Sequence, residues 1–152
     1  MLTHSRPFAP RVRPLALISP HAGYVYSGLV AAAGYRQLKG FEYKTVVVVS
    51  PSHREYFGFS SVLCRGAYRK PLGDIPVDSS LARKIISAGG AMVRCGREGH
   101  FLAGAEMGEH ALEVQLPFLQ TVLGKFRLVP VVMGAQRPED CRALGKALAS
   151  AI

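Results

Sequence analysis

Two histidines stand at matching positions in this chain, each just beyond a short apolar run. His21 follows residues 15–18 and His53 follows residues 45–49, in both cases through a Ser-Pro step. Parallel strands deliver their carboxyl ends to one edge of a sheet, roughly 4.8 Å apart, so the two imidazoles would stand about 5 to 10 Å from each other. Imidazole is a good ligand for iron, copper and zinc. The pair predicts a metal site on His21 and His53.

The residues alone leave a plainer interpretation of these histidines open. Either ring could belong to a turn and bond a backbone carbonyl group, as most polar side chains in turns do. The matching positions of the two rings favour metal binding over this alternative.

A second polar group interrupts an otherwise apolar stretch, and consists of Glu106, Glu109, His110, Glu113 and Gln115. His110 and Glu113 are three residues apart and would share one face of a helix. The two residues could supply a pair of metal ligands, or His110 could be a proton shuttle that Glu113 orients. The alternative is a helical first turn that is rich in acids because the helix dipole favours them.

The segment after the first histidine reads His21-Ala22-Gly23-Tyr24-Val25-Tyr26-Ser27-Gly28. We expect Tyr24 and Tyr26 to line a pocket in which their hydroxyl groups could bond a ligand, although packing would explain either ring equally well. Ser52 and Glu109 adjoin the other two histidines and complete the candidate pocket.

The elements that must position these residues follow from apolar patterning. Buried strands are expected at residues 15–18 and 45–49 and at Arg127–Met133, with a further strand at 57–63 and a short one at 91–94. Helices are expected at 27–38, at 79–88 with Asp78 as N-cap, at 109–116 and 117–123 on either side of Pro117, and at 137–152. The fold class is therefore α/β, with a mostly parallel sheet flanked by helices. Pro130 favours an edge or irregular position for the last strand, because proline cannot donate a ladder hydrogen bond.

Composition excludes several classes of protein. The chain has 152 residues, enough for one domain, and residues 1–14 read as a flexible basic lead-in. A net charge of +9 is spread along the sequence, so nucleic acid is not the expected partner. No apolar run could span a membrane or act as a secretory signal, which predicts a cytoplasmic protein whose three cysteines are reduced. Fingerprints of serine hydrolases and of nucleotide cofactors are missing.

Four ordered motifs closely resemble the Memo family, which includes the prokaryotic proteins called AmmeMemoRadiSam system protein B. They are residues 20–28, 51–53 (Pro-Ser-His), 71–74 (Pro-Leu-Gly-Asp) and 109–118 (Glu-His-Ala-Leu-Glu-Val-Gln-Leu-Pro-Phe). The resemblance implies a fold similar to the class III extradiol dioxygenases, with His21 and His53 as ligands of an iron or copper ion. His110 and Glu113 match the Glu-His-x-x-Glu segment near the same cleft.

The resemblance also predicts that this chain is the N-terminal part, residues 15–152, of a larger and here incomplete Memo-like domain. Family members usually continue into a later half that supplies a Ser-Ser-Asp strand and a third metal ligand, commonly Cys, neither of which is in this sequence. Cys141 does not match that ligand. The first hypothesis is a metal-binding protein of dioxygenase type. The alternatives are a non-enzymatic peptide-binding or protein-binding module with a vestigial metal site, and an unstable fragment.

The expected ligands and partners follow from these hypotheses. They are a small aromatic or peptide ligand and, by family association, a radical SAM protein. The missing half of the domain would leave the last strand as an exposed sheet edge, where a second chain could pair.

Overall fold

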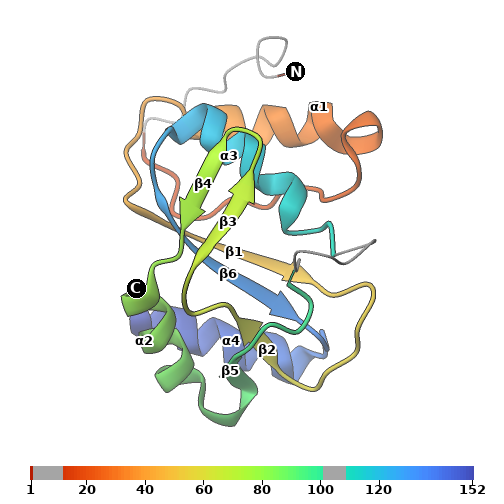
Figure 1. Cartoon of the computed structure of the whole chain (residues 1–152), viewed down its shortest axis with the longest axis vertical. Helices are drawn as coiled ribbons and strands as arrows, with labels where there is room; N and C mark the ends of the chain where they lie inside the picture. Colours follow the sequence, from red (N-terminus) through yellow and green to blue (C-terminus); the bar gives the residue numbers. More distant parts are fainter. Residues whose placement is uncertain (2–11, 101–108) are drawn as a thin grey trace.

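The computed structural model describes residues 1, 12–100 and 109–152 and arranges them in three layers (Figure 1). The middle layer is a four-stranded sheet in the order β1-β6-β2-β5. Helices α1 and α3 cover one face of this sheet, and α2 and α4 cover the other. The expected α/β class is confirmed.

The bounds of the elements are as follows. The sheet contains β1 (Thr45–Pro51), β2 (Ser60–Val62), β5 (Val93–Cys95) and β6 (Arg127–Met133), and β3 (Ala67–Lys70) pairs with β4 (Gly73–Pro76) as a separate hairpin. The α-helices are α1 (Tyr24–Tyr35), α2 (Ser79–Gly89), α3 (Leu116–Leu123) and α4 (Pro138–Ala151). Short 3-10 turns are η2 (Arg36–Leu38), η3 (Gly90–Met92) and η4 (Glu113–Gln115).

Strand β6 shows why the sheet is covered on both faces. Its side chains alternate, so that Leu128 and Val132 pack beneath α1 and α3 while Val129 and Val131 pack against α2 and α4. A nearly continuous apolar strand is what burial on both faces requires. The sequence prediction of a core strand over Arg127–Met133 is confirmed residue for residue.

The expectation that Pro130 places this strand at an edge is wrong. β6 lies between β1, to which it is parallel, and β2, to which it is antiparallel. The carbonyl of Pro130 accepts a hydrogen bond from the backbone amide of Leu63, which lies one residue beyond the end of β2. Leu63 and Pro130 stand opposite each other, so the bond that proline cannot donate is lost just beyond Val62, where β2 ends. The edges of the sheet are β1 and β5.

The expected strand at residues 15–18 does not form, so these residues do not join α1 and β1 in a strand–helix–strand unit. These residues are coil, with Leu15 88% and Ile18 99% exposed. Residues 15–17 and β1 line the same cavity, so a space separates the two backbones. A strand needs a hydrogen-bonded neighbour, and within the described residues this segment has none.

The helix signals were more reliable than the strand signals. Asp78 caps α2 by accepting from the amide of Leu81 at 3.0 Å, and Gly90 ends the helix with a positive φ of 55°. The helix predicted at residues 109–116 does not form, since residues 109–112 are not helical and only the 3-10 turn η4 follows them. Pro117 stands in the first turn of α3. Helix α1 begins three residues before the predicted Ser27, at Tyr24, so that it follows His21 almost directly.

Three further findings bear on the sequence predictions. Most of the predicted lead-in, residues 2–11, lies outside the described residues. Arg13 donates a hydrogen bond to the carbonyl of Glu42, and the carbonyl of Pro14 accepts one from the hydroxyl of Tyr43. Within the described ranges, no helix has the length and apolar character to span a membrane. The expectation that all cysteines are reduced is wrong, because Cys64 and Cys95 form a disulfide.

Candidate metal centre

The two predicted histidines lie side by side. His53 follows the carboxyl end of β1, and His21 lies in the turn before α1. Their ring centroids are 5.2 Å apart, at the short end of the expected range, and the ring planes are tilted by 46°. The juxtaposition arises although residues 15–18 are not a strand. A turn before a helix can deliver a side chain to the same edge of the sheet.

Glu109 is the buried centre of the group. Its side chain is 2% exposed, and Oε1 lies 3.0 Å from the Nδ1 atom of His53. The carboxylate also accepts hydrogen bonds from the backbone amides of His53, at 2.5 Å, and Ala111, at 2.9 Å. Burial raises the pKa of Glu109, but these hydrogen bonds outweigh burial and lower the pKa below its usual value. Glu109 is therefore a carboxylate that fixes the ring of His53.

His110 completes a cluster of three imidazoles. Its ring stacks on that of His53 with centroids 5.4 Å apart, and its Nδ1 atom lies 3.6 Å from Oε1 of Glu109. One ligand atom each from His53, Glu109 and His110 lies within 4.8 Å of the others, which is compatible with a single ion. His21 lies outside this narrower group, and its ring neighbours that of His53.

The protonation state of His21 suits a metal ligand. Partial burial lowers its pKa below the usual value, and the neighbouring His53 and His110 lower it further, while Glu109 opposes the shift. A lowered pKa keeps the imidazole neutral near pH 7, and the neutral form offers a lone pair to a metal.

A buried glutamine fixes the turn that carries His21. Gln115 donates from Nε2 to the carbonyl of Pro20 at 3.2 Å and to that of Ala111 at 3.3 Å. Its Oε1 atom accepts the hydroxyl of Tyr35 at 2.6 Å. Burial raises the pKa of Tyr35 to about 12, so the hydroxyl stays protonated and donates. The sequence singled out Gln115 as a polar residue in an apolar stretch, but no spacing rule indicated this positioning role.

Glu113 does not contact His110. Its Oε1 atom instead lies 2.5 Å from the Nζ atom of Lys70, whose side chain is 7% exposed. The carboxylate that contacts the histidine rings is Glu109. This ion pair attaches the β3–β4 hairpin to the start of η4, and so holds the segment that carries Glu109 and His110.

The other predicted pocket residues occupy different surroundings. Tyr24 donates its hydroxyl to the carbonyl of Val114 at 3.3 Å and packs edge-on against Phe118. Ser52 accepts the amide of Glu55 and so closes the turn that presents His53. Tyr26 is 88% exposed on α1. The structure thus brings together His21, His53, Glu109 and His110, with Tyr24 and Ser52 in the supporting turns.

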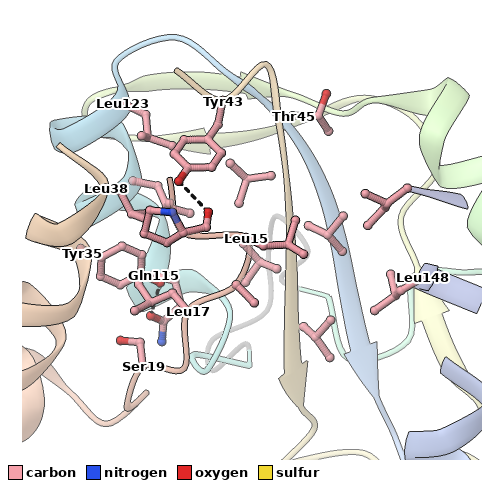
Figure 2. A pocket seen from close by; sticks show the side chains of 18 of the residues that line it. Leu15, Leu17, Ser19, Tyr35, Leu38, Tyr43, Thr45, Gln115, Leu123 and Leu148 are labelled. Atoms are coloured by element: carbon pink, nitrogen blue, oxygen red, sulfur yellow. Dashed lines mark hydrogen bonds between the residues drawn. The ribbon is translucent and has the colours of Figure 1, made fainter. Parts of the chain in front are cut away.

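A cavity of about 690 Å³ adjoins His21 (Figure 2). Apolar side chains from the coil before α1, from β1 and from α4 form most of its wall, including Leu15, Leu17 and Leu148. Ser50 also lines it, and its buried hydroxyl has no hydrogen-bond partner among the described residues. The cavity is therefore apolar with a few polar groups, as small-molecule sites usually are.

The fold and the cluster together define an α/β protein with a histidine-rich candidate metal centre at the carboxyl end of a parallel strand pair. Comparison with known proteins agrees, because a family model described as Memo-like protein matches residues 1–152. The chain therefore belongs to the Memo family.

Curated relatives carry the same family description. A MEMO1 family protein of Methanothermobacter thermautotrophicus is 38% identical over 137 residues, which make up 90% of this chain and 47% of the relative. MEMO1 family proteins of Pyrobaculum arsenaticum and Thermotoga maritima are 38% and 36% identical, over 92% and 91% of this chain and 48% of each relative. This chain spans about half the length of the curated relatives it matches.

Proposed function

We propose that this chain binds an iron or copper ion through its histidine cluster and serves chemistry of dioxygenase type on a small aromatic ligand. The observation that carries the proposal is the contact of two imidazoles, those of His53 and His110, with the buried carboxylate of Glu109, beside the ring of His21. His21, His53 and His110 would hold the ion, with Glu109 against the Nδ1 side of His53. A histidine ligand with a carboxylate on its other ring nitrogen is a recurrent arrangement at metal sites.

The donor set suits the proposed ions. Neutral imidazoles bind iron and copper well, and the low pKa of Glu109 adds one negative charge beside them. At such a site, iron or copper supplies the capacity to activate dioxygen and chelating phenols. The protein would contribute a largely apolar cavity for the aromatic ring beside His21.

Metal analysis tests this proposal. The purified chain is loaded with ferrous or cupric ion, dialysed, and compared with His53→Ala, His110→Ala and, as a matched control, His4→Ala. We expect about one ion per chain in the parent and the control, and a loss of at least tenfold in affinity in the two cluster variants. Equal metal content in all four proteins would overturn the proposal. Oxygen uptake with catechol-type compounds then tests the catalytic step separately.

A second candidate function has its own observation in favour. Within the described residues, β1 pairs only with β6, and residues 45–50 of β1 line the apolar cavity. An unpaired strand edge beside apolar side chains can accept an extended peptide as an added strand. In this alternative the chain is a binding module for an extended apolar polypeptide.

The two candidates are separable by one substitution. Val49, which is 43% exposed on β1, can be changed to Lys to place a charge in the cavity that borders the free edge. If the chain is a peptide-binding module, a fluorescent peptide of alternating valine and threonine binds the parent and not Val49→Lys, while metal content is the same in both. Absence of peptide binding to the parent would exclude the module.

A further inference from the structure

A second chemically distinctive region surrounds the disulfide between Cys64 and Cys95. Cys64 follows β2, and Cys95 ends β5, the strand at one edge of the sheet. The Cα atoms of the two residues are 5.8 Å apart, which is ordinary for a disulfide. Cys95 is exposed and Cys64 is half-buried. A solvated reagent can therefore reach the bond.

This bond lies on the wall of a concavity that is separate from the cavity beside His21. The concavity has a volume of about 790 Å³, and the two cysteines line it. β2 runs antiparallel to β6, so its carboxyl end, where Cys64 lies, points away from the end of β1 that carries His53. Chemistry at the disulfide would therefore not use the histidine cluster.

The concavity is strongly basic. Four cationic side chains line it, those of Arg65, Arg69, Lys70 and Arg97, against one lining carboxylate, Asp74. Arg69 pairs with Asp74 and Lys70 with Glu113. Within the described residues, by contrast, neither a hydrogen bond nor an ion pair occupies the guanidinium groups of Arg65 and Arg97, and both residues are exposed.

Two of these arginines adjoin the disulfide in sequence. Arg65 follows Cys64 directly, and Arg97 is two residues after Cys95. Glu98, the nearest acidic neighbour in sequence, accepts from the hydroxyl of Ser61 at 3.2 Å. Cations beside a disulfide attract an incoming thiolate and stabilise the thiolate that leaves.

We propose that the Cys64–Cys95 disulfide is a thiol–disulfide exchange site for small thiols that carry carboxylates. The thiolate of such a molecule attacks the sulfur of Cys95, which is the more exposed of the two residues, the bond to Cys64 breaks, and Cys64 leaves as a thiolate. A second thiolate attacks the small molecule's sulfur in the mixed disulfide and releases Cys95. Two thiols are oxidised to one small disulfide, and the protein disulfide is reduced by the same two electrons to a dithiol. The arginines select the anionic thiol by charge.

Exchange rates with three thiols of different charge test the proposal. Reduced glutathione is anionic, 2-mercaptoethanol is neutral and cysteamine is cationic, and formation of the protein dithiol is followed by alkylation and mass spectrometry. Each rate constant is divided by that of the same thiol with a neutral small disulfide, which removes differences in intrinsic nucleophilicity. We expect the normalised constant for glutathione to exceed that for cysteamine about tenfold at low ionic strength, and the ratio to shrink in 1 M salt.

Two charge variants show whether these arginines cause the preference. Arg65→Gln with Arg97→Gln should bring the normalised glutathione-to-cysteamine ratio close to one. Arg83→Gln with Arg142→Gln makes the same change in net charge on α2 and α4, and should leave the ratio unchanged. Equal ratios in the two double variants would overturn the proposal, as would alkylation of both Cys64 and Cys95 in protein that was never reduced.

Discussion

The histidine cluster and the basic concavity place reactive side chains in two different ways. At the cluster, buried polar groups hold each reactive group. Glu109 fixes His53, and Gln115 fixes the turn before His21. At the concavity, the arginines beside the disulfide are exposed and make no such bonds within the described residues. In the first region hydrogen bonds fix the positions of the side chains, which a metal site would require. In the second region the arginines contribute positive charge, and charge acts on a ligand without fixed contacts.

This difference predicts that stability and function are coupled at the cluster and separable at the concavity. Substitutions of buried groups around the histidines should change both the free energy of unfolding and metal binding. Substitution of the arginines should change exchange rates alone. Lys70 lines the concavity and pairs with Glu113, and so provides one contact between the two regions.

The largest expected effect is that of reducing the disulfide. The bond joins residues 31 positions apart, and closing a loop of this length restricts the unfolded chain by about 4 kcal/mol. Urea denaturation of oxidised and reduced protein should differ by that amount, while metal content stays the same. If reduction abolished metal binding, the two regions would not be independent.

The pH dependence of stability comes next and involves His100. Burial lowers the pKa of this ring to about 4, with its nitrogens bonded to the Tyr68 hydroxyl and the Ser61 carbonyl. In the unfolded chain the ring titrates near 6.5. Stability from the neutral ring is therefore complete above pH 6.5, and about 3 kcal/mol of it is lost as the pH falls to 4.

Urea midpoints measured between pH 7.5 and 4 check this prediction. His100→Gln should show a shallower loss of stability over the same window. Parallel curves for the two proteins would mean that His100 does not stay neutral in the folded chain.

Replacement of the buried carboxylate should have an intermediate effect. Glu109→Gln keeps the shape of the side chain but turns one acceptor oxygen into a donor, among the amides of His53 and Ala111 and the His53 ring. We expect a loss of about 2 kcal/mol in unfolding free energy, together with weaker metal binding. Glu113→Gln, which removes the partner of Lys70 instead, serves as the comparison and should leave metal affinity closer to that of the parent.

The smallest effect on stability should come from Gln115. Gln115→Leu removes the bond to the Pro20 carbonyl and leaves the Tyr35 hydroxyl without its acceptor, at a cost of about 1 kcal/mol. The loss of metal affinity should be out of proportion to this cost, because the turn that carries His21 is no longer held. Tyr35→Phe removes one of these bonds and keeps the other, so unchanged metal affinity in Tyr35→Phe with lowered affinity in Gln115→Leu would isolate the contact with Pro20.

The sequence predicted the elements whose signals are local. Asp78 before α2 and the alternating burial of Arg127–Met133 follow from capping and periodicity, and both were confirmed. Residues 15–18 were mispredicted because an apolar run makes a strand only where a neighbouring backbone pairs with it. The strand propensity of residues 15–18 carries no information on the cavity that separates them from β1.

The same contrast applies to the two chemical regions. His21 and His53 were predicted together because both follow apolar runs through Ser-Pro, and this rule survived although one of the runs is coil. The disulfide was missed because 31 residues separate its cysteines, and only the parallel pairing of β2 with β5 brings them together. Glu109 was assigned to the pocket, but its central position depends on a loop that no periodicity describes.

The most direct test of the account is the identity of the metal ligands. Pulsed electron paramagnetic resonance of the chain loaded with one equivalent of Cu²⁺ detects nitrogen couplings from each coordinated imidazole. We expect nitrogen couplings from more than one imidazole in the parent. One coupling should be lost in His53→Ala and another in His110→Ala, while His4→Ala should match the parent. Identical couplings in the parent and both cluster variants would contradict the claim that this cluster is a metal centre.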